Sequence, residues 1–122
     1  MLTGTLIGES IRANAPLTGV PLTVTEIRRD EVPDPAPGQP STFTVIAFSA
    51  PDGAADQLAA ALAHSLSARG GWYCDFRTDT ESFVVFAGRI FRYPRGDQAG
   101  RAAAVEYGRS AGVPEHQLDW GH

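Results

Sequence analysis

The chain has 122 residues, of which 43% are apolar and 20% charged, and its formal net charge is −4. This composition fits one globular domain and excludes wholesale disorder. The acidic balance gives the protein no electrostatic reason to bind nucleic acid or an anionic membrane. Its one cysteine, Cys74, cannot form an internal disulfide, and the N-terminus lacks the pattern of a secretory signal, so we expect a cytoplasmic protein.

The first part of the chain, residues 2–29, is predicted to form an N-terminal hairpin. Its first strand lies within 2–12, where two internal glycines indicate a bulge or a sheet edge. Its second strand, at 21–29, alternates apolar and polar residues. Four prolines between 33 and 40 then prevent regular structure and predict a surface loop.

The stretch from 42 to 111 is predicted to be a βαββα unit, followed by a C-terminal tail at 113–122. Its elements are a strand, a helix, two strands and a second helix, at 42–49, about 52–69, 72–77, 83–93 and about 97–110. The strand at 42–49 is apolar on both of its faces, which is typical of an internal strand. Leucines spaced four residues apart predict the first helix, and Asp97 is a good N-cap for the second.

This order of elements predicts one α+β domain that spans residues 1–122. We expect a mixed, mostly antiparallel sheet of about five strands with two helices on one face. A right-handed crossover would make the strands at 42–49 and 72–77 parallel. The arrangement resembles a ferredoxin-like sandwich that lacks its last strand, with the N-terminal hairpin at the vacant edge. The sheet face opposite the helices would be open, which predicts a homodimer.

The sequence contains no motif of a known nucleotide-binding, zinc or catalytic site. Its three histidines and one cysteine lack the spacing of metal ligands, so we expect neither a metal nor a cofactor. Cys74 alternates with Trp72 and Phe76, and we therefore interpret its thiol as part of the core.

The polar side chains of the hairpin at 72–93 are the best candidates for a site. The catalytic candidates are Tyr73, Asp75, Arg77 and His64. An anion site would use the guanidinium groups of Arg77, Arg89 and Arg92. The alternative is a set of cross-strand ion pairs, such as Asp75 with Arg89, each contributing a few tenths of a kcal/mol. The opposite parity of Arg89 and Arg92 favours this alternative.

Because no catalytic constellation is present, the favoured function is that of a binding or accessory module without enzymatic activity. It would dimerise through the open sheet face and bind a protein or a small anionic or apolar ligand. One alternative is a small cofactor-independent enzyme, similar to monooxygenases or isomerases, with a cleft beside the sheet. Another is an acidic inhibitor or immunity-type protein that blocks a basic partner. The sequence identifies no substrate and no partner.

Overall fold

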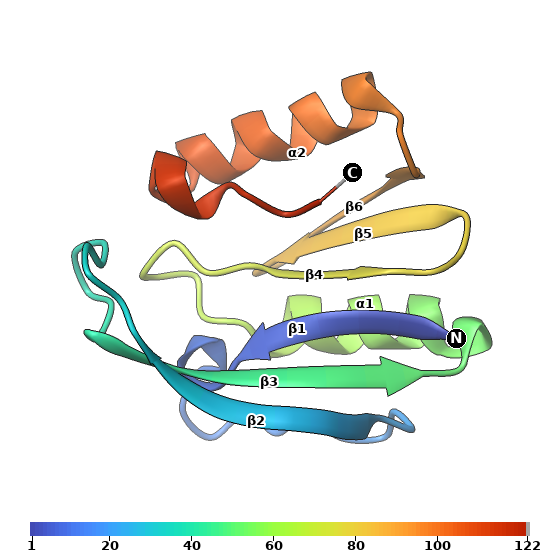
Figure 1. Cartoon of the computed structure of the whole chain (residues 1–122), viewed down its shortest axis with the longest axis horizontal. Helices are drawn as coiled ribbons and strands as arrows, with labels where there is room; N and C mark the ends of the chain where they lie inside the picture. The colour runs from blue at the N-terminus through green and yellow to red at the C-terminus, as the bar shows by residue number, and fades with distance from the viewer. Residues whose placement is uncertain (122) are drawn as a thin grey trace.

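The computed structural model describes residues 1–121, which form an α+β domain with one six-stranded sheet and two α-helices (Figure 1). The strands are β1 (Leu2–Ile7), β2 (Thr23–Glu31), β3 (Thr42–Ala50), β4 (Cys74–Arg77), β5 (Glu81–Phe86) and β6 (Arg89–Pro94). The helices are α1 (Ala55–Ser65) and α2 (Gln98–Ser110). The strand order is β2-β3-β1-β4-β5-β6, and every neighbouring pair is antiparallel. The α+β class is confirmed, but the sheet is antiparallel throughout instead of mixed.

The position of β1 is the main departure from the sequence-based fold. β1 pairs with β3 along one edge and with β4 along the other, whereas β2 pairs with β3. The predicted hairpin of residues 2–29 is therefore wrong, because β3 lies between its two strands. β3 and β4 do run in the same direction, as the crossover predicts. They are not neighbours, since β1 is inserted between them, and so no parallel pair forms.

Gly4 explains how β1 fits at the centre of the sheet. A Cβ atom at this position would lie 2.6 Å from the Cβ of Phe76 and 2.7 Å from the Cζ of Phe48. The glycine thus lets the two aromatic side chains close over β1 on the side of α1. Glycine inside a strand marks either an edge or a close approach, and here it marks a close approach.

We expect Gly4→Ala to destabilise the protein by about 1–3 kcal/mol or more, because the added methyl group overpacks a fixed site. The backbone oxygen of Asp75, 2.7 Å from the same Cβ position, cannot move without disturbing the sheet. Urea denaturation measures the change. Gly53→Ala is the matched control, since a Cβ there meets nothing within 4 Å. Equal unfolding free energies for the two variants would contradict this account of β1.

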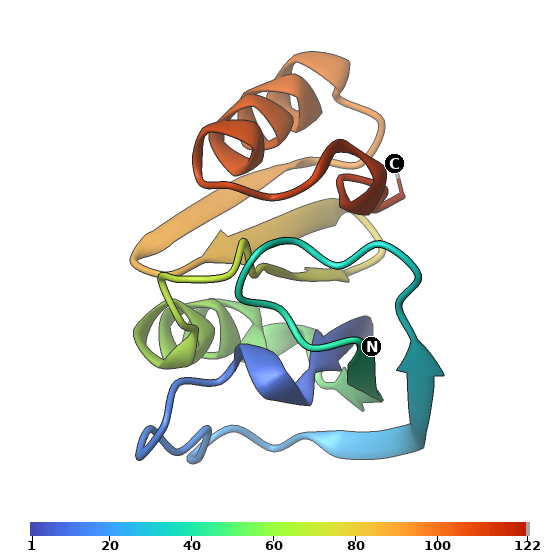
Figure 2. The ribbon, with the colours of Figure 1, turned by 90° about the vertical axis from the view of Figure 1, so that its left-hand side faces the viewer.

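The two helices lie on opposite faces of the sheet, so the prediction that both cover one face is wrong. β5 is apolar on both faces: Phe83 and Val85 join the core beneath α1, while Val84 and Phe86 join a second core beneath α2. Figure 2 shows the β5–β6 hairpin between the two helices. The ferredoxin-like arrangement is not confirmed.

The helix α1 is shorter than the predicted 52–69. It is preceded by a 3-10 turn and ends at Ser65, because Leu66 is extended and forms a bridge with Ile11. The backbone N–H of Ser67 then donates to the carbonyl of Ser10 at 2.8 Å. No helix within residues 1–121 is long and apolar enough to span a membrane.

The second helix, α2, begins as predicted, and its N-cap Asp97 accepts a hydrogen bond from a first-turn N–H at 3.2 Å. Gly112, with a φ of +93°, follows its end. The tail then returns to the sheet, where Leu118 and Trp120 are buried with the core beneath α2. The indole N–H of Trp120 donates to the hydroxyl of Tyr93 at 2.9 Å. The tail is therefore a fixed part of the domain.

α2 and the tail pack against one face of the sheet, and on that face they cover only β4, β5 and β6. On the remainder of that face, Thr3 and Thr5 of β1 are exposed. Every residue of β2 except Asp30 is exposed as well. This uncovered region, built on β1, β2 and β3, is the open half of the sheet.

Candidate functional site

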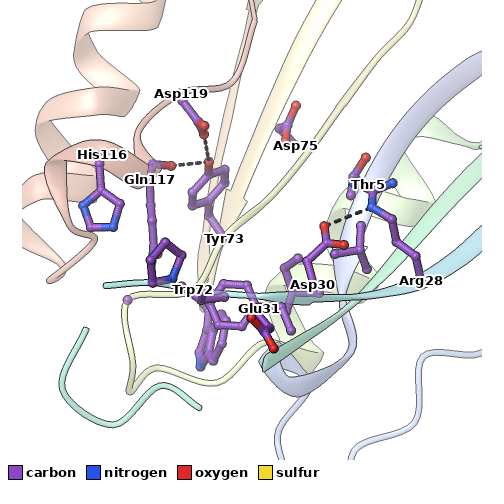
Figure 3. A pocket seen from close by; sticks show the side chains of 16 residues that line it. Thr5, Arg28, Asp30, Glu31, Trp72, Tyr73, Asp75, His116, Gln117 and Asp119 are labelled. Carbon is purple, nitrogen blue, oxygen red and sulfur yellow. Dashed lines mark hydrogen bonds and ion pairs between the residues drawn. The ribbon is translucent and has the colours of Figure 1, made fainter. Parts of the chain in front are cut away.

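A groove crosses the open half of the sheet between the C-terminal tail and β2 (Figure 3). One part of it has a volume of about 380 Å³ and lies between tail residues 116–119 and the end of β2. A second part, of about 390 Å³, continues over β1 and β3. Thr5 and Asp75 line both parts, so we treat them as one feature, the open-face groove.

Asp75 lies on the floor of the open-face groove. It projects from β4, and its register partner on β1 is Thr5. Burial raises the pKa of its carboxyl to about 6, even though Arg77 and the residue's own backbone N–H lower it. The negative charge of Asp119 raises this pKa further. Asp75 is therefore a poorly solvated carboxylate at neutral pH, and a cation brought into the groove would stabilise its charged form.

Tyr73 joins the floor of the groove to the tail. Its hydroxyl donates to the carbonyl of Gln117 and lies 3.3 Å from an Oδ1 of Asp119. Burial and the charges of Asp75 and Asp119 raise the pKa of this phenol well above its ordinary value. The hydroxyl thus remains protonated and acts as a donor that holds the tail wall in place.

Aromatic rings line the groove at the end nearest the tail. The rings of Phe43 and Trp72 have centroids 5.1 Å apart, and both residues line the groove. The ring of Tyr73 packs against Trp120 with centroids 5.0 Å apart. The rings of Phe43, Trp72 and Tyr73 thus give the groove an apolar, aromatic surface beside the Asp75 carboxylate.

The charges around the groove are predominantly negative. Its carboxylates are those of Asp30, Glu31, Asp75 and Asp119, and its guanidinium groups are those of Arg28 and Arg77. The Nε of Arg28 donates to Asp30 at 2.9 Å, and another of its nitrogens donates to Glu26. Four carboxylates therefore line the groove against two guanidinium groups, which leaves it with an excess of negative charge.

The proline-rich loop at 33–40 supports the tail from outside the groove. The side-chain amides of Gln39 and Gln117 exchange hydrogen bonds of 3.1 and 3.0 Å. Gln39 also donates to the carbonyl of Gly70 at 2.6 Å, and the ring Nε2 of His116 lies 3.0 Å from the carbonyl of Asp34. The tail wall is thus held by the loop on one side and by Tyr73 on the other.

The structure brings together three of the four catalytic candidates. Tyr73, Asp75 and Arg77 project from the same side of the segment around β4, and each lines a part of the groove. The fourth, His64, lies on α1 at the other face of the sheet, where its Nε2 is 3.3 Å from a guanidinium nitrogen of Arg12. His64 therefore has no access to the open-face groove.

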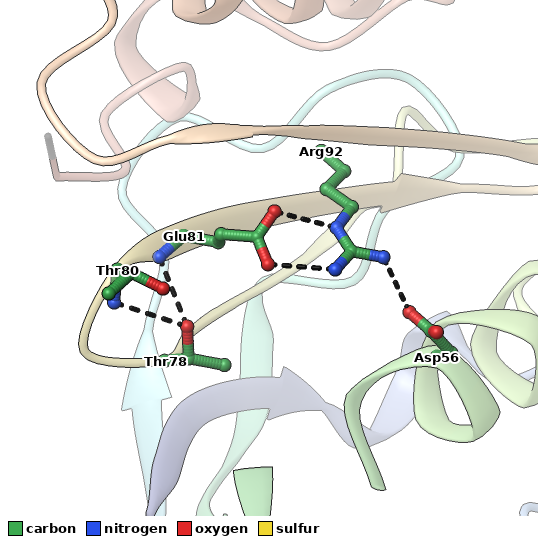
Figure 4. A network of polar contacts seen from close by, with 5 residues as sticks. All are labelled: Asp56, Thr78, Thr80, Glu81 and Arg92. Atoms are coloured by element: carbon green, nitrogen blue, oxygen red, sulfur yellow. Dashed lines mark hydrogen bonds and ion pairs between the residues drawn. The ribbon is translucent and has the colours of Figure 1, made fainter. Parts of the chain in front are cut away.

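The guanidinium groups proposed as an anion site do not converge. Arg92 faces α1, where its Nε and Nη2 donate to both oxygens of Glu81 at 2.7 and 2.8 Å (Figure 4). Its Nη1 donates to Asp56 of α1 at 2.7 Å. Arg89 faces α2, with its guanidinium 4.7 Å from the ring centroid of Phe91. Arg77 alone of the three lines the groove.

Sequence reasoning missed the groove residues that come from distant segments. Thr5 carries a recognisable signal, because the alternation of Thr3, Gly4 and Thr5 gives β1 one polar face. Phe43 and Asp119 carry none, since each belongs to the groove only through the packing of β3 and the tail against β4.

Comparison of the chain with protein-family models, with curated proteins and with solved structures gives no match. No family is assigned on that basis. The chemistry of the open-face groove therefore carries the functional argument.

Proposed function

We propose that this protein is a binding module that holds a small cationic ligand in the open-face groove. The observation that carries the proposal is the carboxylate of Asp75, whose pKa is raised to about 6 at the floor of an acidic groove. An ammonium group beside this carboxylate would replace the solvation that burial removes. The sequence predicted a small anionic or apolar ligand, but the excess of groove carboxylates favours a cation.

The rest of the ligand is proposed to be flat and apolar. The rings of Phe43, Trp72 and Tyr73 line the groove beside Asp75 and suit an aromatic or aliphatic body. A volume of about 380 Å³ lies within the range of small-molecule sites. An amine that carries one aromatic ring satisfies both requirements.

A second function, that of a small cofactor-independent enzyme, is favoured by the same raised pKa of Asp75. A carboxyl with a pKa of about 6 suits a general acid or base near neutral pH. We favour binding because Tyr73 and His64, the other candidates for an acid or base, are engaged elsewhere. The hydroxyl of Tyr73 donates to the tail backbone, and His64 lies on the other face of the sheet.

The test is a titration of ¹⁵N-labelled protein at about pH 7.5 with three probes of one shape, 2-phenylethylamine, 2-phenylethanol and phenylacetate. The amine is protonated at this pH. It is expected to shift the amide resonances of residues 72–75 and 116–119 with a Kd of about 1 mM, typical of so small a ligand. The alcohol and the acid should bind at least about tenfold more weakly, because neither offers a cation to Asp75.

The matched variants are Asp75→Asn and Asp79→Asn. The first removes the proposed anchor with little change in shape, and the second changes an exposed turn residue in the same way. Binding of the amine should weaken about tenfold or more in the first variant and stay unchanged in the second. Equal binding of the amine and the alcohol, or undiminished binding by Asp75→Asn, would refute the proposal.

A further inference from the structure

The outer edge of β2 is a free strand edge of nine residues. β2 pairs with β3 on one side only, and within residues 1–121 no backbone hydrogen bond reaches its other side. Figure 1 shows β2 at the margin of the sheet with no element beyond it. Such an edge presents a row of N–H and C=O groups that can pair with another strand.

We propose that a second copy of this chain binds this edge, with the two β2 strands antiparallel and a two-fold axis at Ile27. Directly opposite residues then have numbers that add up to 54. Glu26 lies opposite the partner's Arg28, and Arg28 lies opposite the partner's Glu26. Residues opposite each other point to the same face, with Cβ atoms about 5 Å apart, so both pairs are in reach of a salt bridge. Arg28 already pairs with Glu26 and Asp30 of its own chain, so the contact joins these pairs into one network of alternating charges.

Charge selects this register among those that the backbone allows. In each β2 strand, every second residue points its N–H group away from β3. A shift by one residue would set these residues opposite residues whose N–H groups point toward β3, so the two strands could not exchange hydrogen bonds. The nearest allowed alternatives move the axis to Glu26 or to Arg28. Each of these sets two like charges directly opposite each other, which is destabilising. The axis at Ile27 is therefore the favoured one.

Apolar side chains on the other face of β2 add to this contact. Ile27 is 64% exposed and Val24 is 52% exposed, which is unusual for large aliphatic residues. The bulge between Val24 and Glu26 places Val24 opposite Phe48, while Ile27 lies opposite Ile46. Pairing about the axis brings each Ile27 against its counterpart and covers part of the exposed surface of both.

Charged residues on edge strands commonly prevent pairing with other chains. In β2 the unlike charges of Glu26 and Arg28 flank Ile27, so the axis at Ile27 pairs unlike charges where the two nearest registers oppose like ones. The resulting contact is isologous and closes at a dimer. It lies at the edge of the sheet, whereas the sequence predicted a dimer through the open face. Arg28 also lines the groove, so the partner strand would border the groove on its β2 side, but the contact needs no bound ligand.

The test is sedimentation velocity at about 5–500 μM protein. The wild-type chain is expected to form a dimer with a Kd of about 10–100 μM, because one pair of strands buries less than a standard interface. Glu26→Arg and Arg28→Glu should each weaken self-association at least about tenfold, since each creates two like-charge contacts. An equimolar mixture of the two variants should associate again, because the arginines of one face the glutamates of the other.

The controls are charge reversals at exposed positions away from β2, Asp79→Arg and Arg69→Glu, which should dimerise as the wild type does. Circular dichroism and urea unfolding establish that each variant is folded. A wild-type chain that stays monomeric up to about 500 μM would refute the proposal, since the expected Kd lies well below this concentration. So would undiminished dimerisation of either β2 variant, or a mixture of folded variants that does not associate.

Discussion

Asp75→Asn is expected to stabilise the folded protein at about pH 7.5 by about 1–3 kcal/mol. The folded state holds the Asp75 carboxylate in a groove where burial raises its pKa from 3.8 to about 6. The charged form is therefore less stable in the folded protein than in the unfolded chain. The amide of Asn carries no charge and avoids this cost, although the same substitution removes the proposed anchor for a ligand.

The pH dependence of unfolding tests the same carboxyl. Because its pKa is higher in the folded state, the folded protein binds this proton more tightly than the unfolded chain does. Its contribution to the free energy of unfolding is fully present below about pH 4 and is lost as the pH rises through about 6. Between these pH values, the free energy of unfolding of the wild type and of Asp79→Asn, measured in urea, should fall relative to that of Asp75→Asn, because all other carboxyls except the exposed Asp79 are common to the three proteins. Parallel profiles for all three proteins would contradict the assignment.

Trp120→Ala is expected to destabilise the protein by about 3–5 kcal/mol, the range for removal of a large buried aromatic residue. The side chain is 5% exposed and packs against Tyr73. Its indole N–H donates to Tyr93, and its carbonyl accepts from Arg101 at 2.9 Å. Loss of the indole should detach the tail, which forms one wall of the groove, and binding of the amine should weaken with it.

The matched control is Tyr93→Phe, which keeps the aromatic ring but leaves the indole N–H of Trp120 without its acceptor. We expect a cost of about 1–3 kcal/mol for this variant. Urea denaturation measures both changes, and ¹⁵N relaxation should show faster motion of residues 114–121 in Trp120→Ala alone. A loss of less than about 1 kcal/mol for Trp120→Ala would show that the tail does not depend on this anchor.

Features that depend on neighbouring residues could be predicted well. Asp97 marks the start of α2 because a short carboxylate caps the free N–H groups of the first turn. Cys74 is buried, as its alternation with aromatic residues indicates, and burial raises the pKa of its thiol. The same two-residue period placed Tyr73, Asp75 and Arg77 on one side of the hairpin, where the groove uses them.

The apolar pattern of β5 was evidence, in the sequence itself, against placing both helices on one face of the sheet. Phe83 and Val85 alternate with Val84 and Phe86, so both faces of this strand are apolar. Such a strand needs cover on both sides, which is inconsistent with two helices on one face. The helices on opposite faces of the sheet satisfy this requirement.

The amino-acid order was enough to identify the helix caps, the strand periodicity and the candidates around β4. These features depend on contacts between residues that are close together in the chain. The insertion of β1 between β3 and β4 was decided by long-range packing, in which Gly4 alone leaves room for Phe48 and Phe76. The groove arose in the same way, because the segment bearing Asp119 meets Tyr73 only after the tail returns across the sheet. Long-range contacts of this kind depend on the whole arrangement of elements, and no local pattern encodes them.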